Sequence, residues 1–321
     1  MVSRERLGWI AVDWGSSNLR AWAMSDAGEV LAQGGSDQGM LALKPEHYEA
    51  ALLGAVSDWL PESGVVDVVV CGMAGARQGW REAAYREVPT RLEALLDGAV
   101  MPDVEDSRLR VCLLPGLCQQ RDASGREFDV MRGEETQLAG LVALDMGFTG
   151  WACLPGTHAK WAYLFQGELA RFQTFLTGEL YRLLAARSVL HHSLGEDDLD
   201  DTSCREAFVT AVGESVAQPA RFSQRLFGIR ASDLLDANLP RGDARAAILA
   251  ARLSGLAIGL ELAAIGVELP PGEPVSLVGA EALCRRYALA LETLEIQSRI
   301  IDSERAVLAG LGQARRALDA T

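Results

Sequence analysis

The sequence has little positive charge, and nearly all of it comes from arginine. Its 321 residues include 30 Lys and Arg against 44 Asp and Glu, giving a formal net charge of −14, and Lys44 and Lys160 are the only lysines. A chain this acidic has no broad basic field that could displace counter-ions from nucleic acid. We therefore expect no nucleic-acid partner, and an anionic ligand would need a local cluster of donors.

Patterns typical of metal binding, redox chemistry and targeting are also missing. The six cysteines form no CxxC pair and the four histidines form no HExxH motif. A zinc site is therefore not expected, and the thiols suit a reducing compartment. The N-terminal sequence lacks a signal-peptide core, and no apolar run reaches the length expected of a membrane span. We expect a cytoplasmic protein without a membrane partner; the sequence does not indicate its oligomeric state.

The pattern of apolar residues predicts an α/β protein. Hydrophobic residues make up 49% of the chain and charged residues 23%, as in globular proteins with a large core. The first half opens with three strands typical of an antiparallel meander, and helices alternate with the later strands. The predicted strands are 7–12, 18–24, 30–33, 65–71 and 111–114, and the predicted helices are 45–60 and 134–144.

The opening pattern recurs in the second half. The predicted strands there are 151–154, 160–165, 169–174, 275–278 and 294–300, and the predicted helices are 178–186, 203–216, 243–265, 281–291 and 303–318. This repetition predicts two duplicated domains, residues 1–145 and 146–321, with their first turns facing a cleft. The apolar stripe of 243–265 is most simply core, and the acidic run 195–201 is most simply a solvated loop.

The first turn, "DWGSSN", has the composition of a phosphate-binding turn. Gly15 allows a close approach, and Ser16, Ser17, Asn18 and the backbone N–H groups can donate to phosphate oxygens. Asp13 cannot bind phosphate, but it could hold a hydrated Mg²⁺. On this stretch alone, an ordinary hairpin turn is the more common explanation.

The second turn, "LPGTHAK", occupies the matching place in the second half. Gly156, Thr157 and Lys160 could hold phosphates there, although a second ordinary hairpin is the alternative. Two matched turns in a duplicated chain are less easily explained by chance than one. No GxxxxGK[ST] phosphate loop, GxGxxG motif or GxSxG motif occurs, so phosphate-loop, dinucleotide-binding and serine-hydrolase classes are not indicated.

Two further stretches carry chemistry. In "MRGEETQ", Glu134 or Glu135 at a helix start could act as the base toward a substrate hydroxyl, and Arg132 suits an anionic ligand. Stabilising acids at a solvated helix start are the plain alternative. In "GMAGARQGW", Arg77, Gln78 and Trp80 could bind a carboxylate substrate, or form a surface loop in which Trp80 anchors the core.

Together these motifs resemble the superfamily of sugar kinases, heat-shock chaperones and actin. The resemblance implies duplicated actin-like ATPase domains of the ribonuclease H-like type, with mixed sheets flanked by helices and a cleft between the domains. Residues 278–283 match its adenosine segment, which implies that Gly279, Ala280 and Leu283 line the adenosine site; Ala280 departs from the usual paired glycines. Helix 133–140 and the last helix match its two interdomain connectors, and the last helix could pack back on the first domain.

The motifs "VDWGSSNLRAW", "GMAGARQGW", "LPGLC", "VMRGEETQLAGL", "LPGTHAKW", "FLTGELY" and "GLAIGLELA" resemble the 2-dehydro-3-deoxygalactonokinase family over nearly the whole chain. The resemblance implies ATP-dependent phosphorylation of 2-dehydro-3-deoxy-D-galactonate at its 6-hydroxyl, for galactonate breakdown. It favours Glu134 over Glu135 as the base, and it implies that Asp13 holds Mg²⁺ through a water molecule. The alternatives are a kinase for another such acid, for example 2-dehydro-3-deoxygluconate, or an actin-like ATPase or sensor that is not a kinase.

Overall fold

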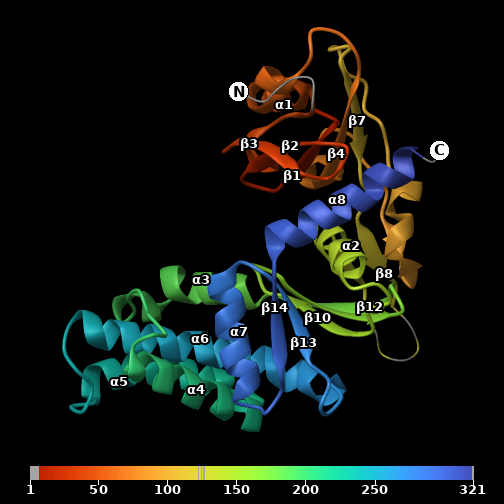
Figure 1. The fold of residues 1–321 in the computed structure, drawn as a ribbon. Coiled ribbons are helices and arrows are strands. Elements are labelled where there is room, and N and C mark those ends of the chain that lie inside the picture. Colours follow the sequence, from red (N-terminus) through yellow and green to blue (C-terminus); the bar gives the residue numbers. More distant parts are fainter. Residues whose placement is uncertain (1–6, 122, 124, 126, 320–321) are drawn as a thin grey trace. The chain divides into compact units, whose positions relative to one another are not determined.

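The computed structural model describes residues 7–121, 123, 125 and 127–319, and these fall into two compact units. Unit 1 combines segments within Met1–Thr149, Tyr163–Phe172 and Ser303–Thr321; unit 2 combines Gly150–Ala162 and Gln173–Asp302. Figure 1 follows the chain through both. The division into domains 1–145 and 146–321 was predicted from the repeated sequence pattern, and it remains a prediction.

Strands and helices alternate through the chain as the sequence pattern indicates. The strands are β1 Trp9–Trp14, β2 Leu19–Met24, β3 Val30–Ser36, β4 Val66–Gly72, β5 Arg86–Glu87, β6 Thr90–Arg91, β7 Leu109–Leu113, β8 Leu117–Gln119, β9 Asp129–Met131, β10 Gly150–Leu154, β11 Ala159–Phe165, β12 Glu168–Phe175, β13 Val275–Gly279 and β14 Ser298–Asp302. The α-helices are α1 Tyr48–Val56, α2 Glu134–Leu144, α3 Thr177–Arg187, α4 Thr202–Ala217, α5 Phe222–Leu235, α6 Asp243–Ile265, α7 Glu281–Glu292 and α8 Ser303–Asp319.

The main sheet of unit 1 has the order β3-β2-β1-β4-β7. Strands β1, β2 and β3 form the predicted antiparallel meander, and β1, β4 and β7 run parallel. Every residue of β4 is buried, as expected for a continuous apolar strand covered on both faces. Because the sheet is partly parallel, the carboxyl ends of β1 and β4 meet at one edge, where ligands of α/β sheets commonly bind.

The two faces of this sheet bury alternate residues of each strand. Ile10 and Val12 of β1 pack in the cluster that contains Leu52 of α1. Trp9 and Ala11 face the opposite way and pack in the cluster that contains Leu311 of α8. The sheet of unit 1 is therefore sandwiched between an early helix and the last helix of the described chain.

Helices α2 and α8 of unit 1 cross at two glycines (Figure 1). A Cβ atom on Gly140 would lie 2.6 Å from the carbonyl carbon of Ala306 and closer still to its oxygen. A Cβ atom on Gly310 would lie 3.0 Å from the carbonyl carbon of Thr136 and closer still to its oxygen. The backbones can approach this closely because neither position carries a side chain.

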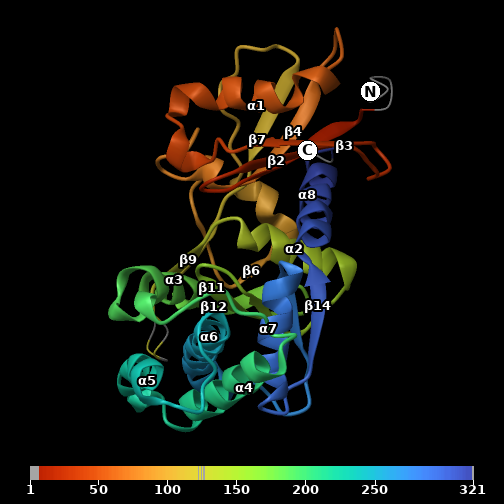
Figure 2. The same cartoon turned by 90° about the vertical axis from the view of Figure 1, so that its left-hand side faces the viewer.

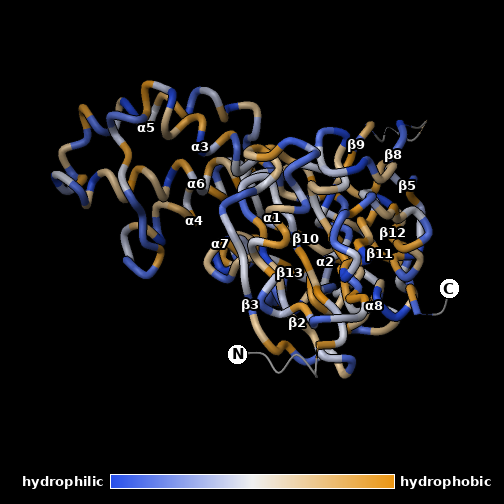
Figure 3. The backbone as a smooth tube through the Cα atoms, turned by 90° about the horizontal axis from the view of Figure 1, so that it is seen from above, coloured by the Kyte–Doolittle hydropathy of each residue, from blue (hydrophilic) through white to orange (hydrophobic). Residues whose placement is uncertain are grey.

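The second large sheet has the order β14-β13-β10-β11-β12-β6, so five of its strands repeat the strand order of the first sheet. Strands β10, β13 and β14 run parallel, matching β1, β4 and β7. All residues of β10 and β13 are buried, and these strands are among the hydrophobic segments of Figure 3. The duplicated α/β fold expected from the sequence is thereby confirmed.

In unit 2, α4 and α6 pack along one another, and α5 packs on α6 (Figure 2). The segment Asp243–Glu268, which contains α6, is long and apolar enough to cross a membrane, with a mean hydropathy of 1.8. The expectation that no such run exists was therefore wrong. However, 72% of the apolar 18-residue stretch within this segment is buried inside the protein, as in the core helix of a folded domain.

Several elements differ from the sequence prediction. Helix α5 was not predicted, although Phe222, Leu226 and Ile229 recur at i, i+4 and i+7 and pack in one apolar cluster; the prediction overlooked this stripe. The three-stranded sheet β5-β8-β9 consists of strands of two or three residues, too short for a periodic signal. The strand predicted from residue 294 begins at Ser298, because the chain first turns at Glu295, whose φ is +59°.

Candidate active site

The turn after β1 in unit 1 holds the first group of predicted ligand residues. Gly15 N–H donates to the Asn18 carbonyl at 2.8 Å, which closes the turn, and the side chains of Ser16, Ser17 and Asn18 are exposed. A second loop braces it, since Met40 N–H donates to the Gly15 carbonyl at 3.1 Å. The turn presents hydroxyl and amide groups to solvent on a fixed backbone, as an anion site requires.

Asp13 lies at the carboxyl end of β1, opposite Cys71 of β4 in the parallel register. One carboxylate oxygen of Asp13 pairs with Arg20, and the other accepts from the Cys71 thiol at 3.8 Å. Burial raises the pKa of Cys71 well above its ordinary value, and the negative charge of Asp13 adds to this effect. Cys71 therefore remains a neutral thiol, and the Asp13 carboxylate forms its ion pair with Arg20 at this strand end.

Two glycines bring the start of α2 against the ends of β1 and β4. Gly72 has a φ of +89°, and a Cβ atom on it would lie 2.6 Å from the carbonyl oxygen of Trp14. Gly133 has a φ of +107°, and its Cβ position would lie 3.5 Å from the Cα of Gly72. Asp13, Gly72 and the first turn of α2 therefore converge within unit 1.

The two acids at the start of α2 have different surroundings. Glu134 is partly exposed, and its Oε2 accepts from the Arg132 N–H at 3.1 Å. Glu135 is fully buried; one oxygen accepts from the Gly133 N–H at 2.6 Å and the other from the Thr136 hydroxyl at 3.1 Å. Burial, followed by the negative charge of Glu134, raises the pKa of Glu135 to about 8.

Arg132 precedes this helix and is held on one side only. Its Nη2 donates to the Ala83 carbonyl at 2.8 Å, and its guanidinium lies 4.4 Å from the ring centre of Tyr85. Nε and Nη1 are buried and have no hydrogen-bond partner within the described residues. Since a Cβ atom on Gly75 would lie 2.9 Å from Nη1, this glycine makes room for the guanidinium.

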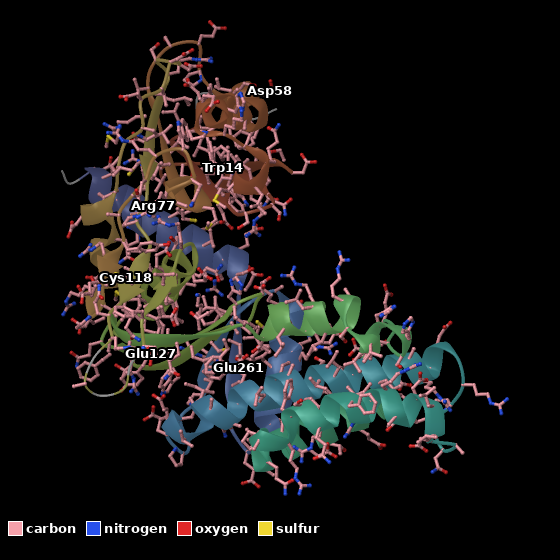
Figure 4. The ribbon with its side chains drawn as sticks, turned by 180° about the vertical axis from the view of Figure 1, so that it is seen from behind. Trp14, Asp58, Arg77, Cys118, Glu127 and Glu261 are labelled. Atoms are coloured by element: carbon pink, nitrogen blue, oxygen red, sulfur yellow. The ribbon has the colours of Figure 1, made fainter. Side chains whose placement is uncertain are left out.

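The remaining predicted sugar-acid residues lie in the loop after β4. Arg77 and Gln78 are exposed, and Arg77 Nε is 3.4 Å from Oε1 of Glu82. Trp80 stacks on Tyr48 with ring centres 5.9 Å apart and meets Trp14 edge-on at 6.1 Å. Figure 4 labels Trp14 and Arg77. Trp80 thus anchors this loop on the core of unit 1, which was the plain alternative for that residue.

A pocket of about 520 Å³ in unit 2 contains the second group of predicted residues. It is bounded by the turn after β10 and by helices α3, α6 and α7. The lining residues are Pro155, Gly156, Thr157, Thr177, Gly178, Tyr181, Arg182, Asp197, Ser254, Ala257, Ile258, Ala280, Leu283, Arg286 and Tyr287. Gly156, Thr157, Ala280 and Leu283, all predicted to bind nucleotide, therefore meet in one pocket.

Of the nucleotide residues predicted in the second half of the chain, two do not line this pocket. Lys160 is buried in β11, and its Nζ donates to the Thr174 hydroxyl at 2.7 Å. Gly279 is buried at the end of β13, where a Cβ atom would lie 3.6 Å from the carbonyl oxygen of Pro155. The tightest neighbour of a Cβ atom on Gly279 would be Cys284 Sγ at 3.2 Å, and the side chain of Lys160 reaches the neighbouring strand β12.

The sequence did not indicate the charged pair on the pocket wall. Arg286 Nη1 is 2.6 Å from Asp197 Oδ2, and both side chains are largely buried. Asp197 belongs to the acidic run that was expected to be a solvated loop. The wall of the pocket on α7 includes three residues at i, i+3 and i+4: Leu283, Arg286 and Tyr287. This helical spacing is the one sequence signal that could have identified this wall.

Comparison with known proteins identifies the family. The family model of 2-keto-3-deoxy-galactonokinases matches residues 13–314. The chain belongs to this family. It is 39% identical over 311 residues to a probable 2-dehydro-3-deoxygalactonokinase of Rhizobium meliloti, covering 97% of both chains. It is 32% identical over 303 residues to the 2-dehydro-3-deoxygalactonokinase of Escherichia coli, covering 94% of this chain and 96% of that one.

The fold agrees with this assignment. A crystal structure from Sinorhizobium meliloti, described as a 2-dehydro-3-deoxygalactonokinase, superposes with a TM-score of 0.85 at 36% identity and covers 97% of this chain and 99% of that one. The predicted family, the actin-like ATPase fold and the carbohydrate-kinase class are therefore confirmed. Membership of a kinase family supports the use of ATP and of a small-molecule substrate by this enzyme.

Proposed function

We propose that this kinase transfers the γ-phosphoryl group of ATP to the 6-hydroxyl of 2-dehydro-3-deoxy-D-galactonate, in galactonate breakdown. The family match carries the proposal. The convergence of Asp13, Gly72 and the start of α2 at one sheet edge supports it, because phosphoryl transfer needs mainly positioning, a metal ion and a base. The free cysteines of the described chain suit a cytoplasmic enzyme.

We propose that Asp13 holds Mg²⁺ through water. Its carboxylate fits this task because Mg²⁺ in phosphoryl-transfer sites usually takes one or two carboxylates in addition to phosphate oxygens and water. The ion would neutralise charge on the transferring phosphates. Ser16, Ser17 and Asn18 are proposed to orient the γ-phosphate, and Gly156 and Thr157 the β- and γ-phosphates. Ala280 and Leu283 are proposed to contact the adenosine; Gly279 and Lys160 do not line the pocket and are assigned no contact with the nucleotide.

We propose Glu134 as the base that accepts the proton of the substrate hydroxyl. Glu134 is partly exposed, whereas Glu135 is fully buried. With a pKa of about 8, Glu135 is mostly protonated at neutral pH, and a glutamine resembles the protonated acid. Glu134→Gln should therefore lower kcat by about 10²–10⁴-fold while ADP still binds, whereas Glu135→Gln should retain kcat within about threefold. The reverse pattern would make Glu135 the base.

We propose that Arg132 pairs with the carboxylate of the sugar acid. A planar guanidinium with two buried donors lacking protein partners is matched by a carboxylate, which can accept both. Arg77 and Gln78 are proposed to contact the same substrate from the exposed loop, with Trp80 holding that loop in place. Arg132→Lys keeps the charge but loses the planar fork, so we expect KM for the sugar acid to rise about tenfold with KM for ATP unchanged. An unchanged KM for the acid would remove Arg132 from the site.

The decisive experiment supplies the purified protein with ATP, Mg²⁺ and either 2-dehydro-3-deoxygalactonate or 2-dehydro-3-deoxygluconate, and measures ADP release. We expect a higher kcat/KM for the galactonate epimer. A higher value for the gluconate epimer would correct the substrate, since the two differ at one stereocentre. Slow hydrolysis of ATP that neither acid stimulates would instead indicate an ATPase or sensor.

A further inference from the structure

A buried carboxylate lies directly behind the pocket of unit 2. Glu261 belongs to α6 and is 2% exposed, among the apolar side chains that form most of this helix. Figure 4 labels its position. A charged group in such surroundings is costly unless donors satisfy it. Its presence within a stripe otherwise suited to packing therefore calls for a specific role.

Three donors from three different elements surround this carboxylate. Trp161 Nε1 of β11 donates to one oxygen at 2.6 Å, and the Tyr287 hydroxyl of α7 donates to the other at 2.9 Å. The Thr177 hydroxyl at the start of α3 bonds it as well. Burial raises the pKa of Glu261, and these three hydrogen bonds oppose that rise. Glu261 thus joins a strand and two helices that do not follow one another in sequence.

Two of the three donors line the pocket itself. Thr177 is followed by Gly178, whose Cβ position would lie 2.9 Å from the Cα of Thr157 and closer still to the carbonyl oxygen of Gly156. In addition, Glu179 N–H donates to the Thr157 carbonyl at 2.9 Å. The start of α3 is therefore docked on the phosphate turn, and any movement of Thr177 moves that turn.

The third element is fixed in the same way. Tyr287 lies on the face of α7 that carries Leu283, one turn away, and both residues line the pocket. The Tyr287 hydroxyl reaches Glu261 from this face. The carboxylate consequently sets the separation between the wall at the start of α3 and the wall formed by α7, without touching the pocket interior.

We propose that Glu261 is a positioning residue for the nucleoside triphosphate: it fixes Thr177 and Tyr287 and thereby holds the pocket at the width that the nucleotide requires. The proposal rests on the proposed assignment of this pocket to the nucleotide. It goes beyond packing, because apolar residues often fill such a position with equal or greater stability. Weakening the network should therefore affect nucleotide binding, and not only stability.

The test measures the Kd of MgADP by calorimetry and the KM values for ATP and for the sugar acid. Glu261→Gln keeps the shape but has one acceptor oxygen in place of two, so the hydrogen bonds that Trp161 and Tyr287 donate to two oxygens cannot both persist as they are; we expect Kd for MgADP and KM for ATP to rise about tenfold. KM for the sugar acid should not change. Tyr287→Phe removes one donor and leaves the carboxyl group in place, and should raise Kd about threefold.

Two controls separate the possible failures. Ser215→Ala removes another buried hydrogen bond to α6, from the Ser215 hydroxyl to the Leu256 carbonyl at 3.0 Å, at residues that do not line the pocket. It should lower the melting temperature and leave Kd unchanged. Leu283→Trp fills the pocket from α7 and should abolish MgADP binding.

The outcomes are distinguishable. Unchanged MgADP binding in Leu283→Trp would show that the nucleotide binds elsewhere, which would overturn the proposed pocket. Lost binding in Leu283→Trp together with wild-type Kd in Glu261→Gln would overturn the role of Glu261 alone. If Glu261→Gln does not fold, Tyr287→Phe decides in the same way: a wild-type Kd rejects the proposal, and a raised Kd with unchanged KM for the sugar acid supports it.

Discussion

The crossing of α2 and α8 makes a quantitative prediction about unit 1. Gly140→Ala adds a methyl group that must fit against the backbone of Ala306, at distances that real Cβ atoms do not adopt. Backbone atoms cannot swing aside, so the helices must separate. Overpacking of this kind costs about 1–3 kcal/mol or more. Alanine regains about 1 kcal/mol through its higher helix propensity.

Gly312→Ala is the matched control on α8. Its added Cβ would meet only Nη1 of the Arg316 side chain at 3.6 Å, so no helix has to move. The propensity gain should then appear alone, raising the unfolding free energy by about 0.8–1.0 kcal/mol. The two variants should therefore differ by about 1–3 kcal/mol, which corresponds to roughly 1.5–4.5 °C in melting temperature for a chain of 321 residues.

The assays are thermal unfolding followed by circular dichroism and the steady-state kinase rate. Because α2 carries Glu134 in its first turn, we also expect a lower kcat in Gly140→Ala and an unchanged kcat in Gly312→Ala. A Gly140→Ala variant that melts at or above Gly312→Ala would refute the reasoning. It would mean that the helices do not pack through bare backbone at this crossing.

Two further predictions follow from buried titratable groups. The pKa of Glu135 rises from 4.5 to about 8 on folding, so the folded state binds this proton more tightly than the unfolded state. The stabilisation from this group is complete below pH 4.5 and is lost as the pH rises to 8, with a slope of up to about 1.4 kcal/mol of unfolding free energy per pH unit. Glu135→Gln should remove this pH dependence from the unfolding free energy measured in urea. Parallel pH profiles of the variant and the wild type would contradict this. Among the cysteines, five are buried and Cys118 is partly exposed, with burial raising its pKa. A thiol reagent should modify Cys118 alone, and slowly, in the folded protein and all six thiols after unfolding; a second thiol reacting at a similar rate would contradict the burial pattern.

The sequence predicts the elements whose signals are local. Helix α6 has the predicted bounds Asp243–Ile265, because a glycine with a φ of +66° precedes a long apolar run. Strand β4 is marked by consecutive apolar residues, and the two meanders are marked by their turns. The short strands β5, β8 and β9 carry no such signal, since only tertiary contacts hold them in place. Helix α5 does carry one, the apolar stripe of Phe222, Leu226 and Ile229, which the prediction missed.

The candidate active site also divides into residues with local sequence signals and residues that only tertiary contacts bring together. Short motifs predicted the members of the two turns, and the pocket indeed contains Gly156 and Thr157. The pairing of Asp197 with Arg286 joins residues 89 positions apart, which no local pattern can indicate. Glu261 was hidden for a different reason: it occupies a helix that is otherwise apolar, and its importance depends on donors from β11, α3 and α7. The proposal of Glu134 over Glu135 as the base relies on their different burial, which adjacent acids in a sequence do not reveal.

The position of α8 in the chain has a consequence for biosynthesis. Trp9, Ala11 and Val69 belong to strands made early, yet they are covered by Val307 and Leu311 of the last described helix. At typical synthesis rates, on the order of 10–50 s separate the completion of β4 from that of α8. During this interval one apolar face of the first sheet is without its native cover. The nascent chain therefore exposes a surface that chaperones could bind, and C-terminal truncations that remove α8 should be far more prone to aggregation than the intact chain.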